Sequence, residues 1–346
     1  MKKCLYLLTI ILTICATAAF DTPTLTVMTY NSFSVSDDLI RKFEDENNVK
    51  IQFLQVGNGG EMVSRAVLTK DTPIADVIIG FDDTQLVKVL TNDILEPFDS
   101  PVLEKIPDEF KSDPENRAIP FNYGDVCINY DTAWFKENEL PLPETLADLT
   151  DPVYSGLLVT EDPSASNTGM SFLLATIAEF GEDGYIDYWK KLLENGLEIT
   201  PDWTTAYYTN FSASSGMGPQ PMVVSYASSP AAEVIYAEEE VPEAPTASLT
   251  ADGMCYRPIE FCGILKNSAN SELAGKFLDA FLGKEWQEDT ALQMFVYPVN
   301  SEAELPAEFV EYGATAENPI QLDPETVNEH RAEWISEWTT QILNNY

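Results

Sequence analysis

The sequence predicts an α/β protein of two domains, each of which interrupts the other along the chain. The 346 residues exceed what a single hydrophobic core usually serves. Apolar runs typical of strands alternate with capped, amphipathic helical segments over most of the length. Two long extended runs, at 117–130 and 254–268, lie where the chain would cross into a second domain and return. Repeated β-α units imply parallel sheets with right-handed crossovers.

The first domain is predicted from alternating strands and helices. Its strands are three apolar, β-rich runs: 24–30, 49–56 and 75–83. A helix is expected after each strand. Ser34 or Ser36 caps the first helix, the glycines of 57–60 lead into the second, and the third covers 83–92. After residue 268 the chain is again predicted to be mostly helical.

The second domain repeats the order of strand, polar turn and helix. The expected segments are strand-turn-helix units at 155–180 and 221–240, a helix at 185–196, and an acidic solvated loop at 238–248. We therefore expect residues 20–124 with 264–346 to form the first domain and residues 125–263 to form the second. The crossover strands would act as hinges beside an interdomain cleft.

Residues 1–19 are predicted to be a secretory signal peptide. Two lysines precede an apolar run over 4–15, and Ala16-Thr17-Ala18 is a small-x-small cleavage site. We therefore expect an exported protein, periplasmic or otherwise extracytoplasmic. An uncleaved membrane anchor, or a lipid on Cys15, is the alternative.

The chain is strongly acidic, with a formal net charge of -38. Such a surface repels nucleic acid and anionic lipid, so neither is expected as a partner. Most of the charge is interpreted as a coat that keeps an exported protein hydrated. A local negative field would also attract a cationic ligand, although salt screens it within about 10 Å.

Three cysteines follow the signal peptide: Cys127, Cys255 and Cys262. In an exported protein Cys255 and Cys262 would pair if a turn separated them, leaving Cys127 odd. Free buried thiols are the alternative.

Motifs for catalysis and for metal binding are missing from the sequence. The single histidine, His330, lies in a helical segment, and there is no G-x-S-x-G, C-x-x-C, H-E-x-x-H or Walker motif. We therefore expect no enzyme activity, no catalytic residue, no metal site and no cofactor.

Three small polar turns each follow a strand and precede a helix: 56–61, 162–169 and 225–233. Each presents backbone N–H groups and hydroxyls at a helix N-terminus, where anionic or polar groups bind. Simple helix capping is the alternative for any one turn. Ligands of open α/β sheets bind at the carboxyl ends of strands, so three such turns beside one cleft predict a ligand site.

Aromatic residues form a second candidate set: Tyr30, Trp203, Tyr207, Tyr226, Phe295 and Tyr297. Each fits either a hydrophobic core or an aromatic cage. Trp203, Tyr207 and Phe211 are spaced as one helix face, which is typical of a core stripe. Trp203 is our choice for the cage and Phe211 for the core.

Several blocks in this order resemble the periplasmic thiamine-binding proteins of ABC importers, a group of type II bacterial solute-binding proteins. They are TYNSF (29–33), ADVIIGFDD (75–83), PFNYGDVCINYD (120–131), SYASSP (225–230), YPVN (297–300) and RAEWISEW (331–338). The resemblance covers about 24–340. It implies the two-domain type II periplasmic-binding-protein fold. It specifies the cargo less well, because related binders carry iron(III), polyamines or phosphonates.

The resemblance implies a ligand shell from both domains. On the first domain Asn58 and Gly59 would line the cleft, with Tyr30 and Asp82 as neighbours. The implied contacts of the second domain, with one later residue, are Ser166, Asn167, Trp203, Tyr226, Ala227, Ser228, Ser229 and Phe295. Residues 226–229 would contact the ligand through the Tyr226 ring, through backbone groups and through the two serine hydroxyls.

Three positions depart from the family pattern. Asn31 and Asn58 stand where relatives have acids, and Phe295 stands where a Trp is common. The departures remove two negative charges and one strong π-face from cation recognition.

The implied function is capture of thiamine, thiamine phosphate or thiamine diphosphate and delivery to an ABC transporter permease, by a monomer. One alternative keeps the fold and changes the cargo to a polyamine or to ferric iron, with Tyr207 and Tyr208 as phenolate ligands. Another is a thiamine-cleaving enzyme with Cys127 as nucleophile and Asp125 as base.

Overall fold

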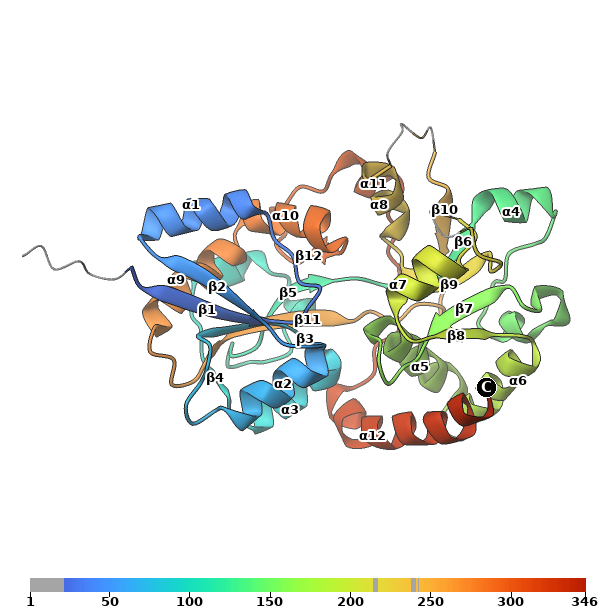
Figure 1. The fold of residues 1–346 in the computed structure, drawn as a ribbon, viewed down its shortest axis with the longest axis horizontal. Coiled ribbons are helices and arrows are strands. Elements are labelled where there is room, and N and C mark those ends of the chain that lie inside the picture. The colour runs from blue at the N-terminus through green and yellow to red at the C-terminus, as the bar shows by residue number, and fades with distance from the viewer. Residues whose placement is uncertain (1–21, 214–216, 238–240, 242) are drawn as a thin grey trace, which may run out of the picture.

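Two sheets, each with helices packed on it, lie side by side in the protein (Figure 1). The structure is a computed structural model that describes residues 22–213, 217–237, 241 and 243–346. The predicted signal peptide and part of the acidic loop at 238–248 lie outside the described residues. The predicted α/β architecture of two domains is confirmed.

The first sheet has the strand order β12-β5-β11-β3-β1-β2, and β4 pairs with β11. Its strands are β1 (Thr24–Thr29), β2 (Lys50–Gln55), β3 (Val77–Asp82), β4 (Leu95–Glu96), β5 (Ile119–Tyr123), β11 (Ile259–Leu265) and β12 (Tyr297–Pro298). β1, β2 and β3 are parallel, but β11 is antiparallel to β3 and β5. The prediction of a wholly parallel sheet is wrong, because β11 returns from the other domain at the edge where β3 ends.

Five helices flank this sheet: α1 (Asp37–Asn47), α2 (Gly59–Leu68), α3 (Asp83–Thr91), α9 (Ser271–Phe281) and α10 (Lys284–Met294). Short 3₁₀ turns follow β4 at Pro101–Lys105 and Asp108–Phe110. Helix α1 buries Leu39 and Phe43, the apolar face that the sequence predicted.

The second sheet has the strand order β10-β6-β9-β7-β8. Its strands are β6 (Val126–Asp131), β7 (Leu158–Glu161), β8 (Glu198–Thr200), β9 (Met222–Tyr226) and β10 (Thr246–Leu249). Its helices are α4 (Thr132–Glu137), α5 (Asn167–Phe180), α6 (Tyr185–Glu194), α7 (Trp203–Thr205) and α8 (Ser229–Ile235). One π-helical turn, Ala206–Asn210, continues α7. This sheet is mixed too, since β6 is antiparallel to β9 and β10 whereas β7 is parallel to β8 and β9.

Both predicted crossover strands are present. β5 ends at Tyr123 and β6 begins at Val126, so two residues carry the chain from the first sheet to the second. On the return path Tyr256 bridges to Val126 in the second domain, and β11 begins at Ile259 in the first. These segments join the two lobes in Figure 1.

The C-terminal segment was expected to belong to the first domain, but part of it packs on the second sheet. After α11 (Ala307–Glu311), helix α12 (Pro324–Gln341) buries Trp334 and Trp338 in the core of the second sheet. Trp338 packs edge-on against Trp189 of α6, and α12 also packs against α3 of the first domain. The remaining boundaries stay a prediction. Within the described ranges no helix, α12 included, is both long and apolar enough to cross a membrane.

Each sheet has a large hydrophobic core of its own. A smaller cluster lies against the second sheet and contains Val159, Ala206, Tyr207, Phe211, Ala213 and Val223, with Trp203 partly buried beside it. The predicted stripe of Trp203, Tyr207 and Phe211 therefore forms, with Phe211 in the core as expected. Trp203 is the end of the stripe that remains accessible.

The cysteine pairing differs from the one that we considered. Cys127 and Cys255 form the disulfide, with Cα atoms 4.4 Å apart, and Cys262 is a free buried thiol. The expected Cys255–Cys262 pair is wrong, because the antiparallel bridge between Val126 and Tyr256 makes Cys127 and Cys255 neighbours across the two crossover segments. Burial raises the pKa of the Cys262 thiol.

Candidate ligand-binding site

The three polar turns follow β2, β7 and β9 and lead into α2, α5 and α8, as predicted. Two of them use their side chains as helix caps. Asn58 Oδ1 accepts a hydrogen bond from Glu61 N (3.0 Å), and Asn58 N donates to Glu61 Oε2 (3.1 Å), which makes a capping box. Ser166 Oγ accepts from Gly169 N at 3.4 Å. The capping interpretation therefore holds for Asn58 and Ser166, and both helix N-termini still present other backbone N–H groups.

The first domain contributes a cluster around Glu260 of β11. Tyr30 Oη, just after β1, donates to Glu260 Oε2 at 3.3 Å, and Asn122 Nδ2 of β5 donates to the same oxygen at 2.7 Å. Tyr30 lies flat on Gly80, where a Cβ would come within 2.1 Å of the ring and where φ is +96°. Glycine at that position in β3 is therefore needed to seat the Tyr30 ring. Burial raises the pKa of the Glu260 carboxyl to about 7, and the Asp82 charge adds to this shift.

Asp82 and Asp83 lie at the junction of β3 and α3, both buried. Asp82 Oδ1 caps α3 by accepting from Thr84 N (3.0 Å) and from Thr84 Oγ1 (2.5 Å). Tyr256, from the second domain, donates its hydroxyl to Asp83 Oδ2 at 2.6 Å. Burial raises the pKa of Asp82, and burial with the neighbouring Asp82 charge raises that of Asp83 to about 7. Asp82 and Asp83 are adjacent at the start of α3, and two like charges so close disfavour ionisation of both carboxyls.

Tyr226, at the end of β9, lies where the acids of the two domains meet. The pKa of its phenol is raised first by burial and then by the nearby carboxylates of Glu260, Asp82 and Glu161. A Cβ on Gly124 would come within 2.9 Å of Tyr226 Cδ1, so glycine in the crossover leaves room for this ring. The structure thus brings together Tyr30, Asp82 and Tyr226, three of the predicted site residues.

Trp203 and two serines form the second part of the site. Trp203 Nε1 donates to Ser225 Oγ at 2.9 Å, and Ser225 Oγ lies 3.0 Å from Ser229 Oγ. The indole stacks on Tyr207 with ring centroids 4.8 Å apart. Trp203 and Ser229 are therefore joined through Ser225, a residue that we had not singled out as a contact.

Three other predicted site residues, Ala227, Ser228 and Phe295, make contacts within the protein. Ala227 uses both backbone groups inside the protein, since its N–H donates to Asp125 O (2.8 Å) and its carbonyl accepts from Ala314 N (3.0 Å). Its expected backbone contact with a ligand stays a prediction, and the carbonyl would have to accept a second hydrogen bond to make it. Ser228 Oγ donates to the Phe295 carbonyl, which fastens α8 to the end of α10. The Phe295 ring packs edge-on against Tyr236 at 5.2 Å.

Gly59 and Asn167 show how differently the two helix starts are covered. Gly59 is buried, and a Cβ there would lie 3.2 Å from Gln85 Oε1 and 3.4 Å from Gly80 O. Asn167 is exposed, as is Asn58. Asn58 and Asn167 are accessible to a ligand that enters from solvent, whereas Gly59 is covered by neighbouring residues.

Glu161 is a residue that the sequence analysis missed. It ends β7 and is fully buried, yet neither carboxylate oxygen has a hydrogen-bond partner in the part of the chain that the structure describes. The pKa of its carboxyl is raised to about 8, chiefly by burial and to a lesser extent by the Asp202 charge, against a hydrogen bond from Thr168 that lowers it. An acid that ends an apolar strand directly before a polar turn, as in GLLVTEDP, was the signal that could have identified it.

The enzyme alternative loses its chemical groups in this structure. Cys127 is in a disulfide, so it offers no thiolate, and Asp125 is paired with Arg257 Nε and Nη2 at 2.6 and 2.8 Å. The nucleophile and base of a thiamine-cleaving enzyme are therefore both occupied. For a metal, the described residues contain no group of three His, Cys, Asp or Glu side chains placed to hold an ion.

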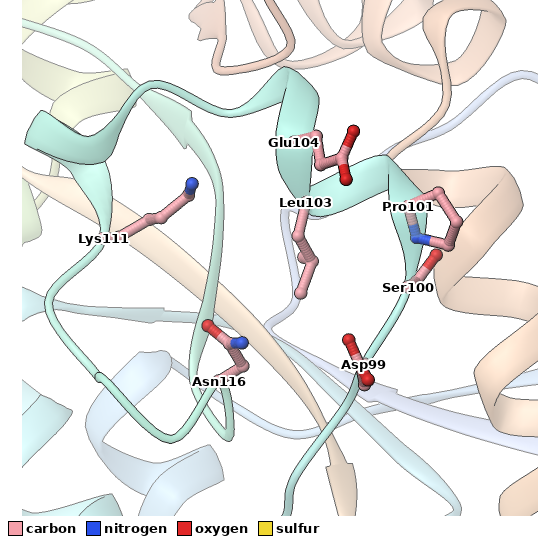
Figure 2. Close-up of a pocket in the computed structure, with 7 residues that line it drawn as sticks. All are labelled: Asp99, Ser100, Pro101, Leu103, Glu104, Lys111 and Asn116. Carbon is pink, nitrogen blue, oxygen red and sulfur yellow. The ribbon is translucent and has the colours of Figure 1, made fainter.

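A separate hollow lies on the first domain (Figure 2). It has a volume of 420 Å³ and is lined by Asp99, Ser100, Pro101, Leu103, Glu104, Lys111 and Asn116. None of the predicted site residues lines it. Its lining carries charges of both signs and no aromatic ring, so we do not assign the ligand to it.

Comparisons with known proteins agree with this architecture. A family model described as bacterial extracellular solute-binding protein matches residues 72–316. A thiamine-binding periplasmic protein of Salmonella typhimurium is 29% identical over 338 residues, which is 96% of this chain and 97% of that protein. Iron uptake protein A1 of Synechocystis is 22% identical over 84% of this chain and 80% of its own length. A solved periplasmic thiamin binding protein superposes with a TM-score of 0.76 at 24% identity, covering 93% of this chain and 96% of that one. At that identity the likeness shows the fold alone.

Proposed function

The chain belongs to the bacterial extracellular solute-binding protein family, and we propose that the solute captured between its two domains is thiamine or one of its phosphate esters. As a family member it is a non-enzymatic binding protein of an ABC importer that works outside the cytoplasm. The proposal adds the cargo, a monomeric state and the predicted site residues.

The observation that carries the proposal is a group of carboxyls gathered around aromatic rings. Burial and then the charges of Glu260, Asp82 and Glu161 raise the pKa of Tyr226, and Glu260 also accepts a hydrogen bond from Tyr30 at 3.3 Å. No arginine or lysine forms an ion pair with any of these acids in the part of the chain that the structure describes. An organic cation such as the thiazolium of thiamine would supply that missing charge. A cation over an aromatic face gains about 0.5–2 kcal/mol.

The site also offers groups for the rest of thiamine. Trp203, Tyr226, Ser228 and Ser229 would contact the heteroaromatic rings, with Tyr30 and Phe295 at the border of the site. A phosphate ester would suit the N-termini of α2 and α5, where Asn58, Gly59, Ser166 and Asn167 lie. These roles are proposed from position and chemistry.

Ferric iron is the second candidate, because one relative is named as an iron uptake protein. Tyr207 and Tyr208 support ferric iron less strongly than the acids near Tyr226 support thiamine. Burial and the Glu233 charge raise the pKa of Tyr207 well above its usual value, which opposes the phenolate that ferric iron requires. Tyr208 is 45% exposed, while Tyr207 is buried.

The test is titration calorimetry of the protein with thiamine, thiamine monophosphate, thiamine diphosphate, ferric citrate and spermidine. We expect one or more thiamine forms to bind at least a hundredfold more tightly than spermidine or ferric citrate. If every thiamine form binds no more tightly than about 1 mM, a free energy of about −4 kcal/mol, the proposed cargo is wrong. Tight binding of ferric citrate alone would establish the iron alternative.

A further inference from the structure

Glu161 differs from every other buried acid that the structure describes. Six carboxyl side chains are buried there: Asp76, Asp82, Asp83, Asp113, Asp125 and Glu161. The five aspartates each accept at least one hydrogen bond, and Asp113 and Asp125 also pair with an arginine. Glu161 alone among them has no partner on either oxygen. Burying a carboxyl without partners opposes folding, so its position needs an explanation.

The surroundings of Glu161 are those of a binding surface. Side chains alternate along a strand, so Glu161 faces the same side of the sheet as Val159, which packs with Tyr207 and Phe211. Val159 pairs with Val223, so the parallel register continued by two residues would bring Glu161 level with Ser225, the residue that holds the Trp203 indole. An indole, hydroxyls and an unpaired carboxyl therefore lie together on one face of β7 and β9.

The neighbouring polar groups do not satisfy Glu161. A hydrogen bond from Thr168 opposes the rise in the Glu161 pKa, but the same hydroxyl lies 2.8 Å from Ser166 Oγ, and neither Glu161 oxygen has a hydrogen-bond partner of ordinary geometry. Asp202 and Tyr226 are the titratable groups that interact with Glu161, and neither is a cation. Burial is the main cause that raises the Glu161 pKa to about 8, with a smaller contribution from the Asp202 carboxylate, whose Oδ1 accepts a hydrogen bond from Thr205 N at 2.8 Å. At neutral pH the unliganded carboxyl is therefore mostly protonated, with one donor and one acceptor free.

We propose that Glu161 is a specificity-determining residue that recognises the aminopyrimidine ring of the ligand by a two-point hydrogen bond. The carboxyl O–H donates to the ring nitrogen beside the amino-bearing carbon, and the carboxyl C=O accepts from the amino group. Both groups of the pair are neutral, so the match needs no counter-ion in a buried site. This inference rests on the proposed function, since it names how one half of thiamine is recognised.

The pairing separates the two halves of the ligand between the two domains. Glu161 and Trp203 of the second domain would take the neutral pyrimidine, and the acids of the first domain would take the thiazolium. A solute with the cation but without the amino group and ring nitrogen would lose the second-domain half of its recognition. That difference is measurable.

The experiment uses two probes and three forms of the full-length mature protein. The probes are thiamine and 3-benzyl-5-(2-hydroxyethyl)-4-methylthiazolium, which keeps the thiazolium and replaces the pyrimidine by phenyl. The proteins are wild type, Glu161→Gln and Glu161→Leu, and binding is measured by calorimetry at pH 7. Glutamine presents the same donor and acceptor as a protonated carboxyl, whereas leucine presents neither.

We expect Glu161→Leu to weaken thiamine binding about 30-fold or more through the loss of two hydrogen bonds, and Glu161→Gln to stay within about threefold of wild type. Affinity for the benzyl probe should change less than about threefold in both variants. The inference is overturned if Glu161→Leu leaves thiamine binding unchanged, or weakens both probes equally. It is also overturned if glutamine is as harmful as leucine, because the carboxylate charge would then be what matters.

A pH series provides a second readout that does not depend on the leucine variant folding. Wild-type affinity for thiamine should fall as pH rises from 7.5 to 9, since the protonated carboxyl is the form that pairs, and Glu161→Gln should not show this fall. An identical fall in both proteins would contradict the pairing. If wild type binds neither probe, the proposed function has failed, whereas normal thiamine binding with an unaffected Glu161→Leu rejects only the role of Glu161.

Discussion

The buried acids of this protein fall into two regions with different partners. In one region, away from the proposed ligand, Asp113 is paired with Arg117 and Asp125 with Arg257. In the other, between the sheets, Asp82, Glu161 and the half-buried Glu260 have neutral donors or no donor at all. Hydrogen bonds from Arg117 lower the pKa of Asp113 against the effect of burial, whereas burial raises the pKa of all three site acids.

The difference teaches how a very acidic chain can reserve a site for a cation. Only 19 lysines and arginines are present for 57 acids. Arginine pairs with Asp113 in a loop and with Asp125 at a crossover. In the described part of the chain the site acids form no ion pair with an arginine, although the charge of Arg331 opposes the rise in the Asp82 pKa. The bound cation would then complete the charge balance of the site. Mutations of the arginine-paired acids should therefore lower stability, whereas mutations of the site acids should mainly weaken binding.

Breaking a structural pair should have the largest effect. Asp125→Asn leaves the Arg257 guanidinium beside a neutral amide at the crossover, where Asp125 also accepts from Ala316 N at 2.6 Å. We expect a loss of about 3–5 kcal/mol in the free energy of unfolding, measured by urea denaturation. The matched control is Glu285→Gln in the exposed Lys42–Glu285 pair, which should leave the urea midpoint unchanged. Equal effects of the two variants would mean that burial of the pair does not matter.

The aromatic stripe allows the same contrast within one short segment. Phe211→Ala removes a fully buried ring and should cost about 3–5 kcal/mol of stability with thiamine affinity unchanged in the folded fraction. Trp203→Ala removes a partly buried ring and should weaken thiamine binding about tenfold, with a much smaller loss of stability. Denaturation and calorimetry on both variants check this. A large fall in stability with normal affinity for Trp203→Ala would place the indole in the core instead.

Much of the fold was predictable because it is locally encoded. Strand runs, capping residues and the polar turns of α2, α5 and α8 all formed where hydrophobic period and Ser, Asn or Gly placed them. The predictions that were wrong concern contacts between residues far apart in the sequence. The Cys127–Cys255 disulfide joins residues 128 apart in sequence, and the antiparallel direction of β11 depends on where the chain re-enters the sheet.

The site was predictable only in part, for the same reason. Tyr30 and Tyr226 were singled out as aromatics at strand ends, Asp82 was implied by the family resemblance, and the three affect one another electrostatically in the structure. Glu161 and Glu260 were missed, because an acid in a strand shows its lack of a cation only after neighbouring strands are placed. Of these two acids, only Glu260 would offset the predicted loss of negative charge at Asn31 and Asn58, since the Glu161 carboxyl is mostly protonated at neutral pH.

Glu260 should sharpen the contrast through pH. Its pKa of about 7 exceeds the ordinary value of 4.5, so the folded state binds more protons than the unfolded state between those values. Stability from this group is therefore present at low pH and lost as pH rises to 7. Glu260→Gln should reduce that loss, with Asp83 retaining part of it. Denaturation at pH 5 and pH 8 measures the change.

The same substitution should act oppositely on binding. An ionised Glu260 attracts the thiazolium, so wild-type affinity for thiamine should rise between pH 6 and 7.5, and Glu260→Gln should flatten this rise and bind about five- to tenfold more weakly at pH 7.5. Calorimetry at matched ionic strength is the measurement. A rise of the same size in the variant would assign it to another group.

The smallest effect is expected from adding a charge at the surface. Asn58→Asp introduces a carboxylate at an exposed residue that caps α2. Aspartate caps a helix about as well as asparagine, so stability should stay within about 0.5 kcal/mol. Because solvent and salt screen an exposed charge, affinity for thiamine at 0.15 M salt should change by less than about threefold. A gain of tenfold or more would show that the ligand's positive charge lies against the α2 turn. The buried acids would then not be its main partners, and the contrast between the two regions would no longer explain cation binding.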